Sequence, residues 1–308
     1  MKSSETGPVH SVLKPPSGGG QYENSVWTGL HGCADALAIA EAFKADDRFY
    51  LVVTEDTHAA LRLEHEIGFF LGNQGSVLHF PDWETLPYDS FSPLPEIVSE
   101  RLRTLVELSS IRKGILLTPV STLMQRLGPR THIHGRTFCL KKGGRLQLQE
   151  MRNRLESVGY HCVQQVLQHG EFAVRGSILD LFPMGSTVPY RVELFDEEIE
   201  SIRVFDPETQ KSDGLIESVN LFPAREFPFD EAAIKHFRQR FRESFPESSS
   251  KNIVYQEISK GIAVAGIEYY LPLFVDSTES LFDYLPKATR IFLHGSVGEA
   301  ADRFSADT

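Results

Sequence analysis

Apolar and polar residues alternate with a period of two over residues 190–195, which predicts a β-strand with two different faces. One face is apolar, and the other carries Arg191, Glu193 and Phe195. An acidic turn then leads into a second alternating run. Residues 190–205 are therefore predicted to form a β-hairpin with one buried face and one face that contacts something else.

Residues 172–182 precede this hairpin and are predicted to form another strand pair, broken at Gly176. An outward Phe195 beside Arg191, with Arg175 on a neighbouring strand, has the composition of a protein-binding hot spot. The alternative is a Phe at the edge of a small satellite core and two solvated arginines. On the pattern alone the alternative is favoured, because scattered exposed apolar residues are normal.

Strands and helices alternate between residues 25 and 123, which predicts a parallel sheet with helical crossovers. The apolar pair Val26-Trp27 is followed by a predicted glycine turn and a predicted helix. Apolar runs then predict the strands 49–53, 76–80 and 115–118. Later apolar runs at 263–270 and 289–293 are expected to complete this sheet.

The balance of charge shifts between Gln125 and Leu155, where eight basic residues occur with one acid, Glu150. We place a domain boundary there, and the next unit includes a helix ended by Gly159. The predicted organisation is a flexible tail, a first α/β segment, an inserted α+β domain and a returning segment, at residues 1–22, 23–125, 126–222 and 223–308. The last residues, 299–308, resemble the start of an uncapped helix, so we expect a fragment of a longer protein.

Composition narrows the class of protein. The chain has 308 residues, 41% hydrophobic and 24% charged, with a formal net charge of -11, which disfavours a general nucleic-acid coat. Three scattered cysteines without zinc spacing fit a reducing cytoplasm. No signal segment and no apolar run of about 18 residues is present in the sequence, so no membrane association is expected.

The turn at 28–35 lies where a phosphate-binding loop belongs, after a predicted strand and before a helix. It lacks the lysine and the adjoining Ser or Thr, because Cys33, Ala34 and Asp35 occupy those positions. A carboxylate at a helix start would repel a triphosphate. We therefore predict a structural loop and no cofactor in this chain.

No other catalytic or metal-binding constellation emerges. His132 and His134 are predicted to share a strand face but lack a third ligand. The aromatic loop 82–95 could stack nucleic-acid bases, yet its carboxylates favour packing over the sheet. The basic stretch 125–155 could touch DNA weakly, although solvation is the default interpretation.

Five ordered motifs resemble the N-terminal part of the bacterial transcription-repair coupling factor family (Mfd), which is similar to the UvrB module of nucleotide excision repair. The motifs are Asp82–Pro93, Thr118–Arg126, Arg175–Gly185, Tyr190–Ile199 and Gly266–Tyr270. The resemblance implies a degenerate helicase-like α/β domain of the P-loop NTPase type, in two chain segments, with the small α+β domain inserted. It also implies that RNA-polymerase-binding and ATP-driven translocase domains follow.

In this family the inserted domain recruits UvrA, and the matching residues are Arg175, Arg191 and Phe195. The resemblance thus reverses the preference for solvated arginines. It implies that RNA polymerase, DNA, ATP and Mg²⁺ bind the missing domains, and that a C-terminal domain covers the UvrA surface at rest. The chain departs from UvrB in its phosphate loop and in lacking room after Trp83 for the aromatic hairpin that clamps damaged DNA.

The resulting hypothesis is a non-catalytic adaptor that recruits UvrA to stalled RNA polymerase. One alternative is a DNA- or nucleotide-binding helicase-like module, disfavoured by the missing lysine. A second is a small-molecule α/β enzyme with a pocket at the carboxyl edge of the sheet, disfavoured by the absence of a paired base and nucleophile in the sequence.

Overall fold

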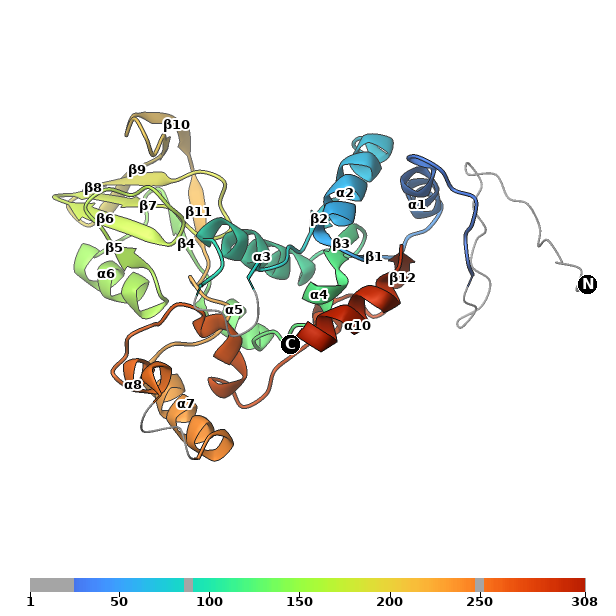
Figure 1. Cartoon of the computed structure of the whole chain (residues 1–308). Helices are drawn as coiled ribbons and strands as arrows, with labels where there is room; N and C mark the ends of the chain where they lie inside the picture. Colours follow the sequence, from blue (N-terminus) through green and yellow to red (C-terminus); the bar gives the residue numbers. More distant parts are fainter. Residues whose placement is uncertain (1–24, 86–90, 247–251, 308) are drawn as a thin grey trace, which may run out of the picture. The chain divides into compact units, whose positions relative to one another are not determined.

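The computed structural model describes residues 25–85, 91–246 and 252–307 (Figure 1). The tail predicted at 1–22, the middle of the aromatic loop at 86–90 and a polar loop at 247–251 lie outside the described residues. The fold is mixed α/β with parallel and antiparallel sheets. Its residues form two compact units. The described part of unit 1 comprises 25–80, 111–121 and 286–306, and unit 2 comprises 81–110, 122–285 and Asp307, apart from the gaps given above.

Unit 1 is built on a four-stranded parallel sheet in the order β12-β1-β3-β2. The strands are β1 (Tyr50–Thr54), β2 (Val77–His79), β3 (Ile115–Pro119) and β12 (Arg290–His294). Every residue of β1 and β3 is buried, as a central parallel strand requires. The predicted strand 289–293 joins this sheet beside β1.

The helices of unit 1 are α1 (Ala34–Lys44), α2 (Thr57–Leu71) and α10 (Val297–Asp307). The Asp56 carboxylate caps α2 by accepting a 2.7 Å hydrogen bond from the backbone N–H of Ala59. Side chains of α1 and α2 pack with β1 and β3 in one apolar cluster that includes Phe43, Leu63 and Leu117.

One expectation for unit 1 is wrong. Residues Val26 and Trp27 form no strand, and Val26 is 86% exposed. Trp27 instead packs its ring edge-on against Phe292 of β12, with centroids 5.3 Å apart. Trp27 alone therefore covers the sheet, from a loop, and the turn before α1 does not follow a strand.

Unit 2 contains a six-stranded sheet in the order β10-β9-β8-β7-β6-β5. The strands are β5 (His161–Cys162), β6 (Glu171–Arg175), β7 (Ile178–Leu181), β8 (Tyr190–Phe195), β9 (Glu198–Phe205) and β10 (Ser212–Ile216). Both predicted strand pairs, β6–β7 and β8–β9, are confirmed as antiparallel. Gly176 (φ 60°) and Asp196 (φ 58°) supply the left-handed backbone that their turns require.

A two-stranded sheet and two helices accompany the six-stranded sheet. The elements are β4 (Phe138–Lys141), β11 (Ser218–Leu221), α5 (Arg130–Arg136) and α6 (Leu148–Ser157). Gly159 follows α6 with φ 95°, as predicted. The prediction that His132 and His134 share a strand face is wrong, because α5 begins directly after Pro129 and buries only Ile133.

The remaining elements of unit 2 are helical: α3 (Pro95–Leu108), α7 (Glu231–Ser244), α8 (Ile253–Ser259), the 3₁₀ helix η1 (Ile267–Leu273) and α9 (Leu281–Tyr284). A short helix, α4 (Val120–Leu123), lies where the two units meet in the sequence. The apolar run predicted to rejoin the parallel sheet at 263–270 leads into η1 instead. Phe227, Phe237, Phe241 and Phe274 form the aromatic core around α7 and η1.

An ion pair is enclosed in unit 2. Arg101 of α3 is fully buried and donates from Nε to Glu226 Oε1 at 2.6 Å, and from Nη1 to the carbonyl of Pro81 at 2.8 Å. Its guanidinium also lies 4.8 Å from the ring centre of Trp83. These contacts hold α3 to the segment after β11. The domain boundaries at 125 and 222 stay predictions.

Candidate protein-binding surface

Phe195 ends β8 and projects from the sheet. Val192 and Leu194 of the same strand are buried, whereas Phe195 is 76% exposed. The alternation predicted for this strand is therefore confirmed. The positive φ at Asp196 turns the chain immediately after the ring, so that Phe195 stands at the end of the hairpin.

Asp180 of β7 organises the two arginines predicted for this surface. It lies opposite Arg191 of β8, and its carboxylate accepts bonds from Arg191 Nε at 2.7 Å and Nη2 at 3.0 Å. Arg175 of β6 forms an ion pair with the same carboxylate. Because β7 separates β6 from β8, the expectation that Arg175 lies on a strand adjacent to Arg191 is wrong. Asp180, which is fully buried, connects them.

Arg191 is enclosed by hydrogen-bond acceptors and an aromatic ring, so it is not a solvated side chain. Its Nη1 donates to the carbonyl of Gln210 at 3.2 Å and to Ser212 Oγ at 3.0 Å, and the guanidinium lies 5.0 Å from the Phe205 ring centre. The hydrogen-bonded carboxylate of Asp180 raises the pKa of Arg191. Only 15% of its side chain is exposed, against 50% for Arg175.

Two further residues extend this face toward β10. Arg203 of β9 lies opposite Arg191, and Leu215 of β10 lies opposite Arg203, so that all three share one face of the sheet. The side chain of Arg203 is 41% exposed, and Leu215 is 60% exposed. We call Arg175, Arg191, Phe195, Arg203 and Leu215 the hairpin surface.

Sequence reasoning missed Asp180, Arg203 and Leu215. Asp180 carried a detectable signal, because a carboxylate flanked by Leu179 and Leu181 in an apolar strand needs a cationic partner when buried. Arg203 and Leu215 could be placed only once the pairing of β8, β9 and β10 was known.

The first turn of α1 carries a carboxylate, Asp35, that is bound by other residues of unit 1. Asp35 accepts a 2.8 Å bond from Arg62 Nη2, and its Oδ2 lies 2.8 Å from His294 Nε2. Burial opposes ionisation of Asp35, but these bonds and one from the N–H of Ala36 outweigh it and lower the pKa of the carboxyl group. The start of α1 thus already carries an anion paired within unit 1, where a bound phosphate would need free donors.

The basic stretch 125–155 is largely engaged with other residues of unit 2. Ion pairs join Arg130 to Glu279, Arg136 to Asp230, Arg145 to Glu197 and Arg152 to Glu156. Arg126 donates to Thr278, and the guanidinium carbon of Arg154 lies 3.7 Å from the ring centre of Phe138. These contacts reduce the positive charge that the stretch can present to a phosphate backbone.

The aromatic loop and the histidines offer no base platform or metal site in the described residues. Trp83 is only 4% exposed and packs against Tyr269, with ring centroids 5.2 Å apart. Burial lowers the pKa of His132 to about 4, and its Nε2 donates to the carbonyl of Arg225 at 3.1 Å. The described ranges hold no group of three or more His, Cys, Asp or Glu residues arranged for a metal ion. Nor does any described helix have the length and apolar character needed to span a membrane.

Comparison with known proteins places this surface in a family context. Residues 138–227, which include Arg175, Arg191 and Phe195, match the UvrB interaction domain. The chain is 52% identical over 257 residues to a transcription-repair-coupling factor of Haemophilus influenzae, covering 83% of this chain and 22% of the relative. Its identity to the Escherichia coli protein of the same name is 45% over 280 residues, 91% of this chain and 24% of the relative. A Staphylococcus haemolyticus relative is 31% identical over 230 residues, or 75% and 20% of the two chains. The chain therefore spans less than a quarter of the length of these relatives.

Proposed function

We propose that this chain, which belongs to the transcription-repair coupling factor family as its UvrB-homology module, recruits the repair protein UvrA through the hairpin surface. The match of residues 138–227 to the UvrB interaction domain carries this proposal, because it contains the whole six-stranded sheet. The match also agrees with the family resemblance of the five sequence motifs.

The charges on the hairpin surface suit an acidic partner. Arg175 and Arg191 carry two guanidinium charges against the single carboxylate of Asp180, which leaves one net positive charge in the cluster. The half-exposed Arg175 can turn its remaining donors to a carboxylate of the partner. Arg191 contributes mainly by holding the carboxylate of Asp180 in place, and this carboxylate in turn fixes the position of Arg175.

Phe195 supplies the apolar anchor in this proposal. An exposed ring at the end of a rigid hairpin can enter a pocket with little loss of conformational entropy, since it has only two side-chain torsions. Arg203 and Leu215 lie level with Arg191 on the same face and serve as peripheral contacts. The geometry therefore supports one central aromatic anchor, an adjacent cation and a polar rim.

The chain itself is proposed to be non-catalytic and cytoplasmic, with a degenerate helicase-like α/β domain formed by its flanking segments. The ion-paired Asp35 at the start of α1 supports the absence of nucleotide chemistry there. In the whole protein, we propose that RNA polymerase, DNA and ATP engage other domains, and that a C-terminal domain masks the hairpin surface at rest.

Calorimetric titration of the chain with UvrA tests the central proposal. Phe195→Ala is expected to weaken binding about 30-fold, the equivalent of about 2 kcal/mol for a hot-spot aromatic. Phe69→Ala is the matched control, because Phe69 of α2 is 79% exposed but lies in unit 1. Equal UvrA affinity of wild type and Phe195→Ala would overturn the assignment of the surface.

A further inference from the structure

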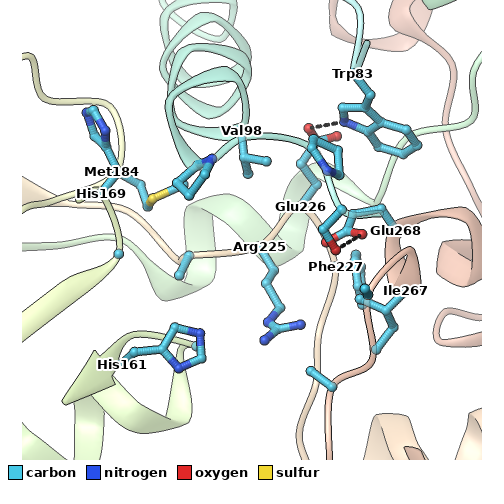
Figure 2. A pocket seen from close by; sticks show the side chains of 18 of the residues that line it. Trp83, Val98, His161, His169, Met184, Arg225, Glu226, Phe227, Ile267 and Glu268 are labelled. Atoms are coloured by element: carbon cyan, nitrogen blue, oxygen red, sulfur yellow. Dashed lines mark hydrogen bonds between the residues drawn. The ribbon is translucent and has the colours of Figure 1, made fainter. Parts of the chain in front are cut away.

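Unit 2 contains a cavity of about 290 Å³ that the proposed function does not use (Figure 2). Its wall comes from five parts of the chain: Trp83, residues 92–98 at the start of α3, residues 159–184 around β5 and β6, the segment 224–227 and the segment 263–268. Val98, Met184 and Ile267 give it an apolar lining. A volume of this size is at the small end of ligand-binding cavities.

Arg225 places a cation in this cavity. Figure 2 shows its side chain extending into the space between His161 and Glu268. Its Nε is buried and has no hydrogen-bond partner among the described residues, and its guanidinium lies 5.0 Å from the ring centre of Phe229. Burial lowers the pKa of Arg225, and the carboxylate of Glu268 opposes this effect. An arginine in such a site gains most from an anion that completes its hydrogen bonds.

The start of α3 also favours a negative charge in the cavity. Helix α3 has 14 residues and no side-chain cap, and its first residue, Pro95, lines the cavity together with Val98. His169 also lines it: Nε2 donates to the carbonyl of Ser186 at 2.8 Å, while Nδ1 is buried without a partner among the described residues. Burial lowers the pKa of His169, so the neutral ring presents an acceptor at Nδ1 and adds no positive charge to the cavity.

The carboxylates of the wall limit the charge that the cavity accepts. Glu226 is neutralised by Arg101. Glu268 accepts a 2.8 Å bond from Ser92, and burial raises its pKa. A second negative charge on a ligand would therefore be repelled by Glu268, whereas a single negative charge would be stabilised by Arg225.

We propose that this cavity binds a small organic monoanion, with a carboxylate or a singly charged phosphate monoester group on Arg225 and an apolar body against Val98, Met184 and Ile267. The ligand would touch segments from the start of α3, the six-stranded sheet and the approach to η1 at once. Binding would stabilise unit 2 without involving the hairpin surface.

Calorimetry and thermal unfolding of the full chain with four probes test this site at about pH 5.5, where a phosphate monoester is mainly a monoanion. Phenylacetate and phenyl phosphate carry the two anionic groups on the same ring, phenylacetamide is the neutral isostere, and inorganic phosphate lacks the apolar body. Phenylacetate or phenyl phosphate is expected to bind saturably and to raise the melting temperature, while phenylacetamide and inorganic phosphate bind at least tenfold more weakly. The stronger of the two anions identifies the head group.

Variants assign the binding to the cavity. Arg225→Gln is expected to weaken anion binding at least tenfold, whereas Arg154→Gln, which removes a similar arginine stacked on Phe138 outside the cavity, leaves it unchanged. Ala265→Trp adds bulk at an exposed lining residue and should also block binding with little effect on folding. Failure of both anions to bind the wild type, or equal binding by Arg225→Gln, overturns the proposal. Neither outcome affects UvrA recruitment, which is measured separately.

Discussion

Asp180 and Arg191 face each other across neighbouring strands, and Arg191 donates to both carboxylate oxygens, from Nε at 2.7 Å and from Nη2 at 3.0 Å. Arg175 reaches the same carboxylate from the strand on the other side of β7. A single buried acid therefore fixes two cations on the surface proposed to meet UvrA.

Replacing Asp180 should damage both stability and binding. Asp180→Asn removes the charge that Arg191 needs and leaves a largely buried guanidinium unpaired, which typically costs about 3 kcal/mol. Urea unfolding is expected to show a loss of this order, and titration with UvrA should show weaker binding at temperatures where the variant stays folded. Glu200→Gln, an exposed change on β9, serves as the control and should alter neither quantity. Unchanged unfolding of Asp180→Asn would contradict the role given to the pair.

The enclosed pair of Arg101 and Glu226 makes a different prediction. Arg101→Met should destabilise the chain by about 3–5 kcal/mol, because Glu226 would remain buried without its cation. The double variant Arg101→Met with Glu226→Leu should recover much of that loss, since no charge is then buried alone. Additive losses in the two single variants and the double variant, measured by urea unfolding, would exclude this coupling.

Asp35 predicts a stability loss at acid pH. Its folded-state pKa lies below the usual value of 3.8, so its contribution is complete above that value and is lost as pH falls through the folded pKa. Asp35→Asn should flatten this part of the stability profile below about pH 4 and lower stability at neutral pH by about 1 kcal/mol, a discounted figure for a partly exposed pair. Chemical unfolding followed from pH 7 to pH 3 measures both effects.

His132 predicts a second, separate pH dependence. Its pKa of about 4 in the folded state is below the unfolded value near 6.5, so the unfolded chain binds the proton more tightly. Stability should therefore be constant above pH 6.5 and decline by up to about 3 kcal/mol as pH falls from 6.5 to 4. His132→Gln keeps a donor for the carbonyl of Arg225 and should make the decline shallower. An identical slope in wild type and variant would show that His132 does not titrate in this way.

The sequence predicted the hairpin and the exposure of Phe195 because strand alternation is a local property. It could not predict that Arg191 is enclosed, because that depends on β7 lying between β6 and β8 and on which residues oppose Asp180. Local pattern also misplaced His132 and Val26. The histidine follows a proline that starts a helix, and the valine belongs to a loop whose neighbouring Trp27 covers Phe292.

One of the two strands that pair with β1 comes from near the end of the described chain. Tyr50 pairs in register with Arg290, a residue 240 positions away, whereas its other neighbour, Ile115, is much closer in sequence. At translation rates of roughly 5–20 residues per second, the ribosome needs roughly 10–50 s to synthesise the intervening chain. Until β12 is made, β1 can pair only with β3, and its other edge stays open although all strands of the six-stranded sheet have been synthesised. The parallel sheet is therefore the last sheet of this module that can be completed, and its open edge needs protection during synthesis.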